Sequence, residues 1–199
     1  MQAREITLPG PVTALSAEGD GPPLVLLHGI GSSARGFRAA LPFLPQRRML
    51  APDMPGYGGS APLPAEFPQP DAFADWLAAV LDTAGIGGAD LLGHSLGGVM
   101  VAAFARRHPH RIRRIVLSAP ARGYAVQDPA EWPPGAWKRL RDLEAMGAEA
   151  YAAARAQRLV YRQQAAPGVQ AEMARLTRAG LAASTALLAR GDTMGWLAT

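Results

Sequence analysis

Short apolar runs alternate with glycine- and proline-rich turns through the first part of the chain. The runs near residues 24–27, 48–52, 90–92 and 114–118 are continuous rather than alternating, which is typical of strands buried on both faces of a parallel sheet. Residues 4–17 predict an antiparallel hairpin at the edge of that sheet. With helices between the later runs, the pattern predicts an α/β fold with a mostly parallel sheet.

The clearest helix is expected at residues 71–84, where apolar side chains recur at i, i+3, i+4 and i+7. Asp71 is its expected N-cap and Gly85 the residue that follows its end. A short helix is expected near residues 33–41, and a longer one runs from residue 96 to residue 108, where Pro109 stops it.

The pattern changes after residue 120. Residues 121–190 contain no apolar strand run and are rich in alanine and arginine. The sequence therefore predicts a core over residues 1–120, a helical segment over 121–190 and, over 191–199, the start of a return to the core. Within the helical segment, helices are expected at residues 135–146, 148–163 and 169–189.

Composition excludes several kinds of chemistry. The 199 residues include no cysteine, so disulfides, thiolate metal sites and thiol nucleophiles are absent. Lys138, the one lysine, does not lie in a Gly-Lys-Ser/Thr motif, which excludes a P-loop. The net charge of +4 is spread along the chain rather than clustered, so nucleic acid is not an expected partner. The N-terminus lacks an apolar signal core and no apolar stretch is long enough to span a membrane, so we expect a soluble, cytoplasmic protein.

One motif carries recognisable chemistry. Gly93-His94-Ser95-Leu96-Gly97 matches G-x-S-x-G between an expected strand and an expected helix. At such a sharp turn, side chains at the two glycines would collide with neighbouring backbone, and the serine hydroxyl is pushed outward. The start of the helix places the N–H of Leu96 near a developing oxyanion.

A second oxyanion donor is expected at the end of the strand formed by residues 24–27. His28-Gly29-Ile30 follows that strand, and the N–H of Ile30 is the best candidate. Gly29 and Gly31 allow the backbone to turn and approach a ligand. His28 is interpreted as a structural imidazole that braces this loop.

The chain resembles the α/β-hydrolase superfamily in these segments and in two more, Asp53-Met54-Pro55-Gly56-Tyr57-Gly58-Gly59-Ser60 and His108-Pro109. The nearest branch is that of enol-lactonases and carbon–carbon-bond hydrolases. The resemblance implies a helical cap over residues 121–190 and an acyl-enzyme on Ser95, formed from a small ester-like or lactone substrate. It also implies no metal and no organic cofactor. Its site residues would be Ser95 as nucleophile, Ile30 and Leu96 as oxyanion donors, and His28, Gly29, Gly93, His94 and Gly97 as supporting residues.

The chain departs from the family where the acid and the histidine of the triad should follow the serine. No histidine follows His110, and His108 and His110 are expected at the surface. The His94 side chain is expected to point away from the serine. Asp128 and Asp192 suit a turn and a helix terminus. We therefore expect a chain truncated before its last two strands, weak or inactive by itself, with residues 114–118 as an open sheet edge through which it associates.

Three alternatives remain open. The first is a dinucleotide-binding domain, because its fingerprint is mimicked by Gly29-Ile30-Gly31-Ser32-Ser33-Ala34 followed by Asp53. The serine elbow would then be a coincidence. The chain would otherwise be a non-catalytic binding module with the same fold, or an acyltransferase. The arginines of residues 121–199 favour a carboxylated substrate.

Overall fold

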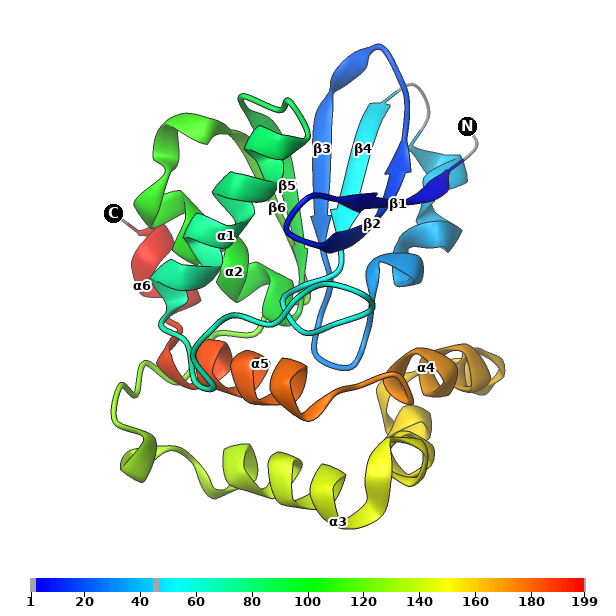
Figure 1. The fold of residues 1–199 in the computed structure, drawn as a ribbon, viewed down its shortest axis with the longest axis vertical. Coiled ribbons are helices and arrows are strands. Elements are labelled where there is room, and N and C mark those ends of the chain that lie inside the picture. Colours follow the sequence, from blue (N-terminus) through cyan, green and yellow to red (C-terminus); the bar gives the residue numbers. More distant parts are fainter. Residues whose placement is uncertain (1–2, 45–46, 199) are drawn as a thin grey trace.

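The computed structural model describes residues 3–44 and 47–198, and its centre is a six-stranded sheet (Figure 1). The strand order is β1-β2-β4-β3-β5-β6; β1 and β2 are antiparallel to their neighbours, and the other pairs are parallel, as the sequence predicts. The strands are β1 (Arg4–Leu8), β2 (Val12–Ala17), β3 (Gly21–Leu27), β4 (Arg47–Pro52), β5 (Ala89–His94) and β6 (Ile112–Ser118).

Helices cover the sheet and extend beyond its carboxyl end. The α-helices are α1 (Pro70–Thr83), α2 (Leu96–Arg107), α3 (Pro134–Ala156), α4 (Ala166–Met173), α5 (Arg178–Arg190) and α6 (Thr193–Leu197). The 3₁₀ helices are η1 (Ala34–Phe43), η2 (Pro109–Arg111), η3 (Pro129–Glu131), η4 (Gln157–Leu159) and η5 (Gln163–Ala165).

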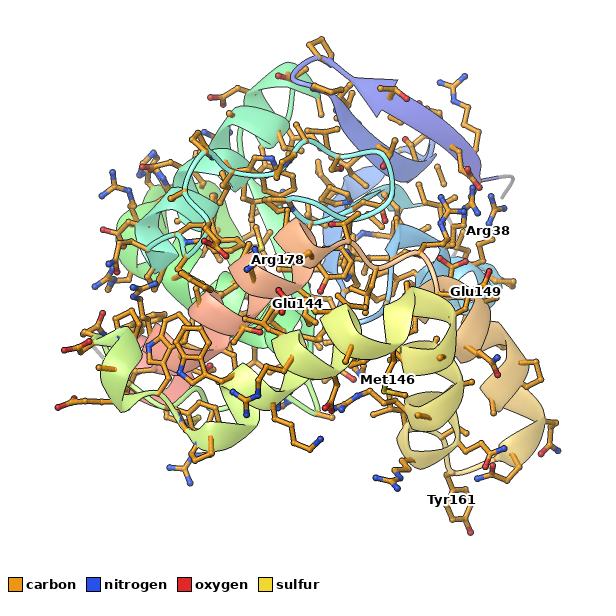
Figure 2. The ribbon with its side chains drawn as sticks, turned by 60° about the horizontal axis from the view of Figure 1, so that its bottom comes forward. Arg38, Glu144, Met146, Glu149, Tyr161 and Arg178 are labelled. Carbon is orange, nitrogen blue, oxygen red and sulfur yellow. The ribbon has the colours of Figure 1, made fainter. Side chains whose placement is uncertain are left out.

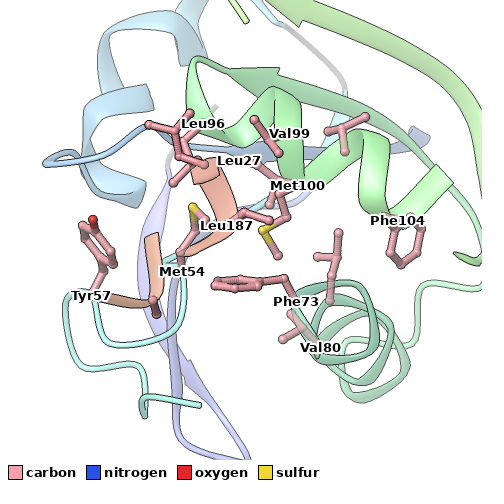
Figure 3. Packing of buried hydrophobic residues seen from close by; sticks show 14 of the residues in the cluster. Leu27, Met54, Tyr57, Phe73, Val80, Leu96, Val99, Met100, Phe104 and Leu187 are labelled. Atoms are coloured by element: carbon pink, nitrogen blue, oxygen red, sulfur yellow. The ribbon is translucent and has the colours of Figure 1, made fainter. Parts of the chain in front are cut away.

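Alternate residues of the central strands supply two separate apolar layers. Val25 and Leu27 of β3 join the large cluster with Phe73 of α1 and Met100 of α2 (Figure 3). Leu26, one position away, belongs to the smaller cluster beneath η1. Because successive strand residues face opposite sides, burial on both faces requires the continuous apolar run seen in the sequence.

The ends of α1 follow from proline and glycine chemistry. Pro70 occupies the first helical position, so the expectation that Asp71 caps the helix is wrong and Asp71 lies inside the first turn. At the other end Gly85 adopts φ +63°, as expected for the residue after the helix. The N–H of Ile86 then donates to the carbonyl of Leu81 at 2.8 Å and closes the terminus.

The helical segment beyond β6 breaks at more points than expected. The predicted break after residue 146 is confirmed, because Gly147 takes φ +76° and ψ 163° inside α3. The next helix ends at Ala156 rather than at residue 163. The single helix expected over 169–189 is instead α4 and α5, because Thr177 caps α5 by accepting the N–H of Gly180 at 2.9 Å.

In Figure 1, α5 lies across the carboxyl end of the sheet, with α3 on its far side. Arg178 of α5 joins three segments, because its Nε donates to Glu144 of α3 and its Nη1 to Glu66, each at 2.5 Å (Figure 2). Buried Arg190 donates to the carbonyl of Phe67 at 2.9 Å and lies 5.0 Å from the ring centre of Trp132. The helical segment is thus fastened to the core at both ends of α5.

The outer edge of β6 has no strand partner among the described residues, since β6 pairs with β5 alone. Val116 on this strand is half exposed. Across residues 3–44 and 47–198, no helix combines the length and apolarity that crossing a membrane requires.

Candidate active site

Sheet topology creates a crevice at the carboxyl ends of β3 and β5. These strands are adjacent and parallel, yet β3 leads to η1 on one face of the sheet and β5 leads to α2 on the other. Chain segments that leave in opposite directions open a gap between them, which is where open α/β sheets bind ligands. Ile30 follows β3 and Ser95 follows β5, so both lie at this gap.

Ser95 has a strained backbone, with φ 53° and ψ −116°. Its N–H donates to the carbonyl of Ser118 at 3.1 Å, and its carbonyl accepts the N–H groups of Gly98 at 2.9 Å and Ala121 at 3.0 Å. These bonds attach the turn to the end of β6 and to the first turn of α2. The surrounding structure therefore holds a conformation that a non-glycine residue rarely adopts.

The flanking glycines make this turn possible, as the sequence predicts. A Cβ at Gly97 would overlap the carbonyl oxygen of Leu27, and a Cβ at Gly93 would overlap that of Gly97. A Cβ at Gly29 would lie 3.0 Å from the Cβ of Ser95. The absence of these side chains lets the loop after β3 approach the serine closely.

Residues 28–33, which we call the oxyanion loop, begin at a fully buried imidazole. His28 Nε2 accepts the N–H of Met54 at 3.0 Å, so the proton is assigned to Nδ1, which lies 2.9 Å from the carbonyl of Gly29. The ring of Tyr57 packs on it in an edge-to-face arrangement, with ring centres 5.0 Å apart. Burial lowers the pKa of His28, which keeps the imidazole neutral.

Two cavities meet at Ser95. The arginine cavity, about 530 Å³, lies beneath α3 and is also lined by Ile30, Leu96, Arg139 and Arg155. No acidic residue lines it among the described residues, and Nη1 of Arg139 is buried without a hydrogen-bond partner. Such a group is suited to receive an anionic oxygen.

The second cavity, which we call the loop cavity, lies between η1 and α4 and measures about 720 Å³. Ile30, Ser95, His94 and Glu172 contribute to its wall. Ser95 and Ile30 therefore line two chambers: the arginine cavity has no acidic residue in its described wall, whereas the loop cavity has Glu172 together with Arg35 and Arg38.

The structure brings Ser95, Ile30 and Leu96 together, but no histidine forms a hydrogen bond with the serine within the described part of the chain. His94 lines the loop cavity beside Ser95, in contrast to the expected orientation away from it. A Cβ added to Gly29 would lie 3.5 Å from Nδ1 of His94 and 3.4 Å from Oγ of Ser95. The side chains of His94 and Ser95 are thus close enough to line the same cavity.

The remaining candidates lie elsewhere. His108 Nε2 is 3.0 Å from Asp75 Oδ1, and His110 is exposed. Asp128 accepts a backbone N–H at the start of η3, and Asp192 does the same at the start of α6. Asp192 therefore caps a helix, as the sequence suggests, whereas Asp128, expected in a turn, caps the short 3₁₀ helix η3.

Both carboxylate oxygens of Asp53 accept hydrogen bonds within the fold, which removes the basis for dinucleotide binding. Its Oδ1 accepts the N–H of Ala34 at 2.7 Å, and its Oδ2 accepts the hydroxyl of Thr13 at 2.6 Å. The carboxylate fastens η1 and β2 to the end of β4 and is not free to bind a ribose. In the described residues no three histidine, aspartate or glutamate side chains gather where they would hold a metal ion.

Sequence reasoning did not single out Arg139, Arg155 or Glu172. Its only signal for the arginines was the positive charge of the helical segment, which does not say which of them turn inward. That choice depends on the bend at Gly147, which separates Arg139 from Arg155 within α3.

We expect Gly97→Ala to lower the free energy of unfolding by about 3 kcal/mol, because the new Cβ would force the backbone of β3 and α2 apart. Urea unfolding followed by circular dichroism measures this. Gly135→Ala is the control, since a Cβ there has open space, and its effect should stay below about 1 kcal/mol. Equal effects of the two changes would contradict the steric argument.

Stability should fall as the pH drops below the ordinary His28 pKa of 6.5. The folded-state pKa is lower, so below this value the unfolded chain binds a proton that the folded chain excludes, at a cost of up to about 1.4 kcal/mol per pH unit. Urea unfolding at about pH 7.5 and about pH 5.5 measures the loss. The loss should shrink in His28→Gln and persist in His110→Gln, which alters an exposed ring; an unchanged loss in His28→Gln would refute the assignment.

Comparison with known proteins agrees with this architecture. Residues 22–179 match the family model described as the alpha/beta hydrolase fold. The chain is 42% identical over 123 residues to the 2-hydroxymuconate semialdehyde hydrolase of Pseudomonas sp. strain CF600; the match covers 59% of this chain and 43% of that protein. It is 36% identical over 118 residues to the pimeloyl-acyl carrier protein methyl ester esterase of Aromatoleum aromaticum, with 57% and 44% covered.

Solved structures share the fold over nearly the whole chain. The enol-lactonase from Burkholderia xenovorans LB400 superposes with a TM-score of 0.76 at 21% identity, covering 96% of this chain and 75% of that one. The matches to the curated relatives span less than half of the relatives' own length. The family model covers most of this chain, and the chain therefore belongs to the α/β-hydrolase fold family.

Proposed function

We propose that this chain carries the nucleophile and oxyanion donors of a serine hydrolase that cleaves an ester, lactone or related acyl bond. The observation that carries the proposal is Ser95, held at positive φ between β5 and α2 with its hydroxyl on two cavities. In this mechanism Ser95 Oγ attacks the substrate carbonyl and forms an acyl-enzyme. The N–H groups of Ile30 and Leu96 stabilise the oxyanion.

The general base is the part that these residues do not supply. No described histidine hydrogen-bonds to Ser95, and deprotonation of the serine needs such a base. Residues 1–199 alone should therefore turn esters over slowly, with the oxyanion donors supporting a residual rate. Full-rate, Ser95-dependent turnover by this chain would contradict this part of the proposal.

Modification by a fluorophosphonate, mapped by mass spectrometry, tests the nucleophile. We expect slow modification at Ser95 that disappears in Ser95→Ala, because the strained turn presents this hydroxyl to the cavities. Ser16→Ala, on β2, should leave the modification unchanged. A chain that folds but is not modified at Ser95 would favour a non-catalytic binding module of the same fold.

The arginine cavity supports a substrate that carries a carboxylate. Arg139 and Arg155 come from the two halves of the bent helix α3, and Arg155 also stacks on Tyr151, 4.9 Å from its ring centre. The Nη1 of Arg139 is buried and lacks an acceptor, which a bound carboxylate would supply. We extend the proposal to residues 121–190 as a helical cap that provides this recognition above Ser95.

We expect Arg139→Gln in the Ser95→Ala background to weaken binding of a dicarboxylate monomethyl ester about tenfold, the usual scale for losing a charge-assisted bond. Isothermal titration calorimetry measures the dissociation constant. Binding of the matching dimethyl ester, which has no free carboxylate, should not change. Arg141→Gln is the matched control, since Arg141 is exposed on the same helix; equal losses for the two variants would point to general electrostatic attraction rather than a built site.

A further inference from the structure

The core holds the oxyanion loop at its start and in its middle. His28 is fixed by the N–H of Met54, and the N–H of Gly31 donates to the hydroxyl of Tyr57. Burial raises the pKa of Tyr57 to about 12, so the phenol stays neutral, and its oxygen also accepts the hydroxyl of Ser184 from α5 at 2.9 Å. These contacts leave the far end of the loop to be held by another element.

The C-terminal end of α4 contacts the far end of the oxyanion loop. Ser33 Oγ donates to Oε2 of Glu172 at 2.6 Å and accepts the N–H of Arg35 at 3.1 Å, which caps η1. The next residue, Met173, places its Cε 2.6 Å from where a Cβ on Gly31 would lie. Gly31 takes φ +75°, a conformation that favours glycine, and the end of the Met173 side chain fills the space beside it. Figure 1 shows α4 beside the segment that leaves β3.

Ile30 lies between these two sets of contacts. An oxyanion donor works only when its N–H is about 2.7–3.1 Å from the position that the oxyanion will occupy, so small displacements of the loop matter. We propose that Glu172 is a positioning residue, whose carboxylate latches Ser33 and so couples the seating of α4 to the alignment of the Ile30 N–H. This inference rests on the proposed role of Ile30 in hydrolysis.

Glu172 acts here as a hydrogen-bond acceptor and not through its charge. A carboxylate on the cavity that holds Ser95 would by itself oppose the build-up of negative charge on the substrate. The charged and titratable groups around it are Arg35 and Arg38, each paired with Glu5 at 2.7 Å, His94 in the same cavity wall, and neutral His28. The structural consequence is that Glu172→Gln, which keeps an acceptor for Ser33, should preserve the latch, whereas Glu172→Ala should release it.

Hydrogen–deuterium exchange of the peptide spanning residues 28–36 tests the latch without requiring activity. In Glu172→Ala we expect exchange at the amides of Gly31 and Arg35 to speed up about tenfold, since local opening frees both donors. Glu172→Gln should match the unaltered protein. Glu149→Ala is the control for lost cap charge, because Glu149 is exposed on α3 (Figure 2). Adding Ser33→Ala to Glu172→Ala should give no further increase at the amide of Gly31; a further increase is expected at the amide of Arg35 alone, because this change also removes the oxygen that caps η1.

The rate of Ser95 modification by a fluorophosphonate provides the functional readout. It should fall about tenfold in Glu172→Ala and recover in Glu172→Gln, a loss smaller than the roughly 10²–10³ for removing an oxyanion donor outright. Unchanged exchange in Glu172→Ala would overturn the latch, and a Gln variant that behaves like Ala would overturn the acceptor role. If Ser95 in the unaltered protein fails to react while exchange follows the expected order, the proposed function fails and the latch between α4 and the loop stands.

Discussion

The strained turn at Ser95 is the constraint on which the rest of the site depends. A non-glycine residue at positive φ costs about 1–3 kcal/mol, and the turn persists because three backbone hydrogen bonds and two flanking glycines leave it no alternative. Helix α2 begins at the next residue, and its first nine residues are buried. A helix packed this tightly cannot shift to relieve the turn, so the serine stays at the crevice.

The other parts of the site are placed relative to that serine by sheet topology. Because β3 and β5 pair in parallel, the ends of both strands reach the same edge, and Gly29 comes against the Ser95 side chain. Helix α5, fastened to the core by Arg178 and Arg190, contacts α3, and α3 in turn packs on α4. The site is therefore assembled from segments far apart in the chain, and each is fixed by contacts outside the site itself.

Charge differs across this assembly in a way that follows from burial. His28 and Tyr57 support the oxyanion loop as neutral groups, because the surrounding core disfavours their ionised forms. The walls of the two cavities carry charged groups, with Arg139 and Arg155 in the arginine cavity and Glu172, Arg35 and Arg38 in the loop cavity. A substrate that spans both chambers would meet arginines in each and, among the described residues, an acidic side chain only in the loop cavity.

The sequence by itself determined the features that depend on a few neighbouring residues. These are the order of strands and helices, the serine elbow with its glycines, and the break at Gly147, because local sterics and hydrophobic period act over short distances. Even there it misjudged the start of α1 and the gap between α4 and α5. Tertiary structure alone decided that the Asp53 carboxylate is hydrogen-bonded to Ala34, that Arg139 lines the cavity that holds Ser95, and that Glu172 reaches Ser33, 139 positions away. Such contacts arise from the packing of whole elements, which no local pattern encodes.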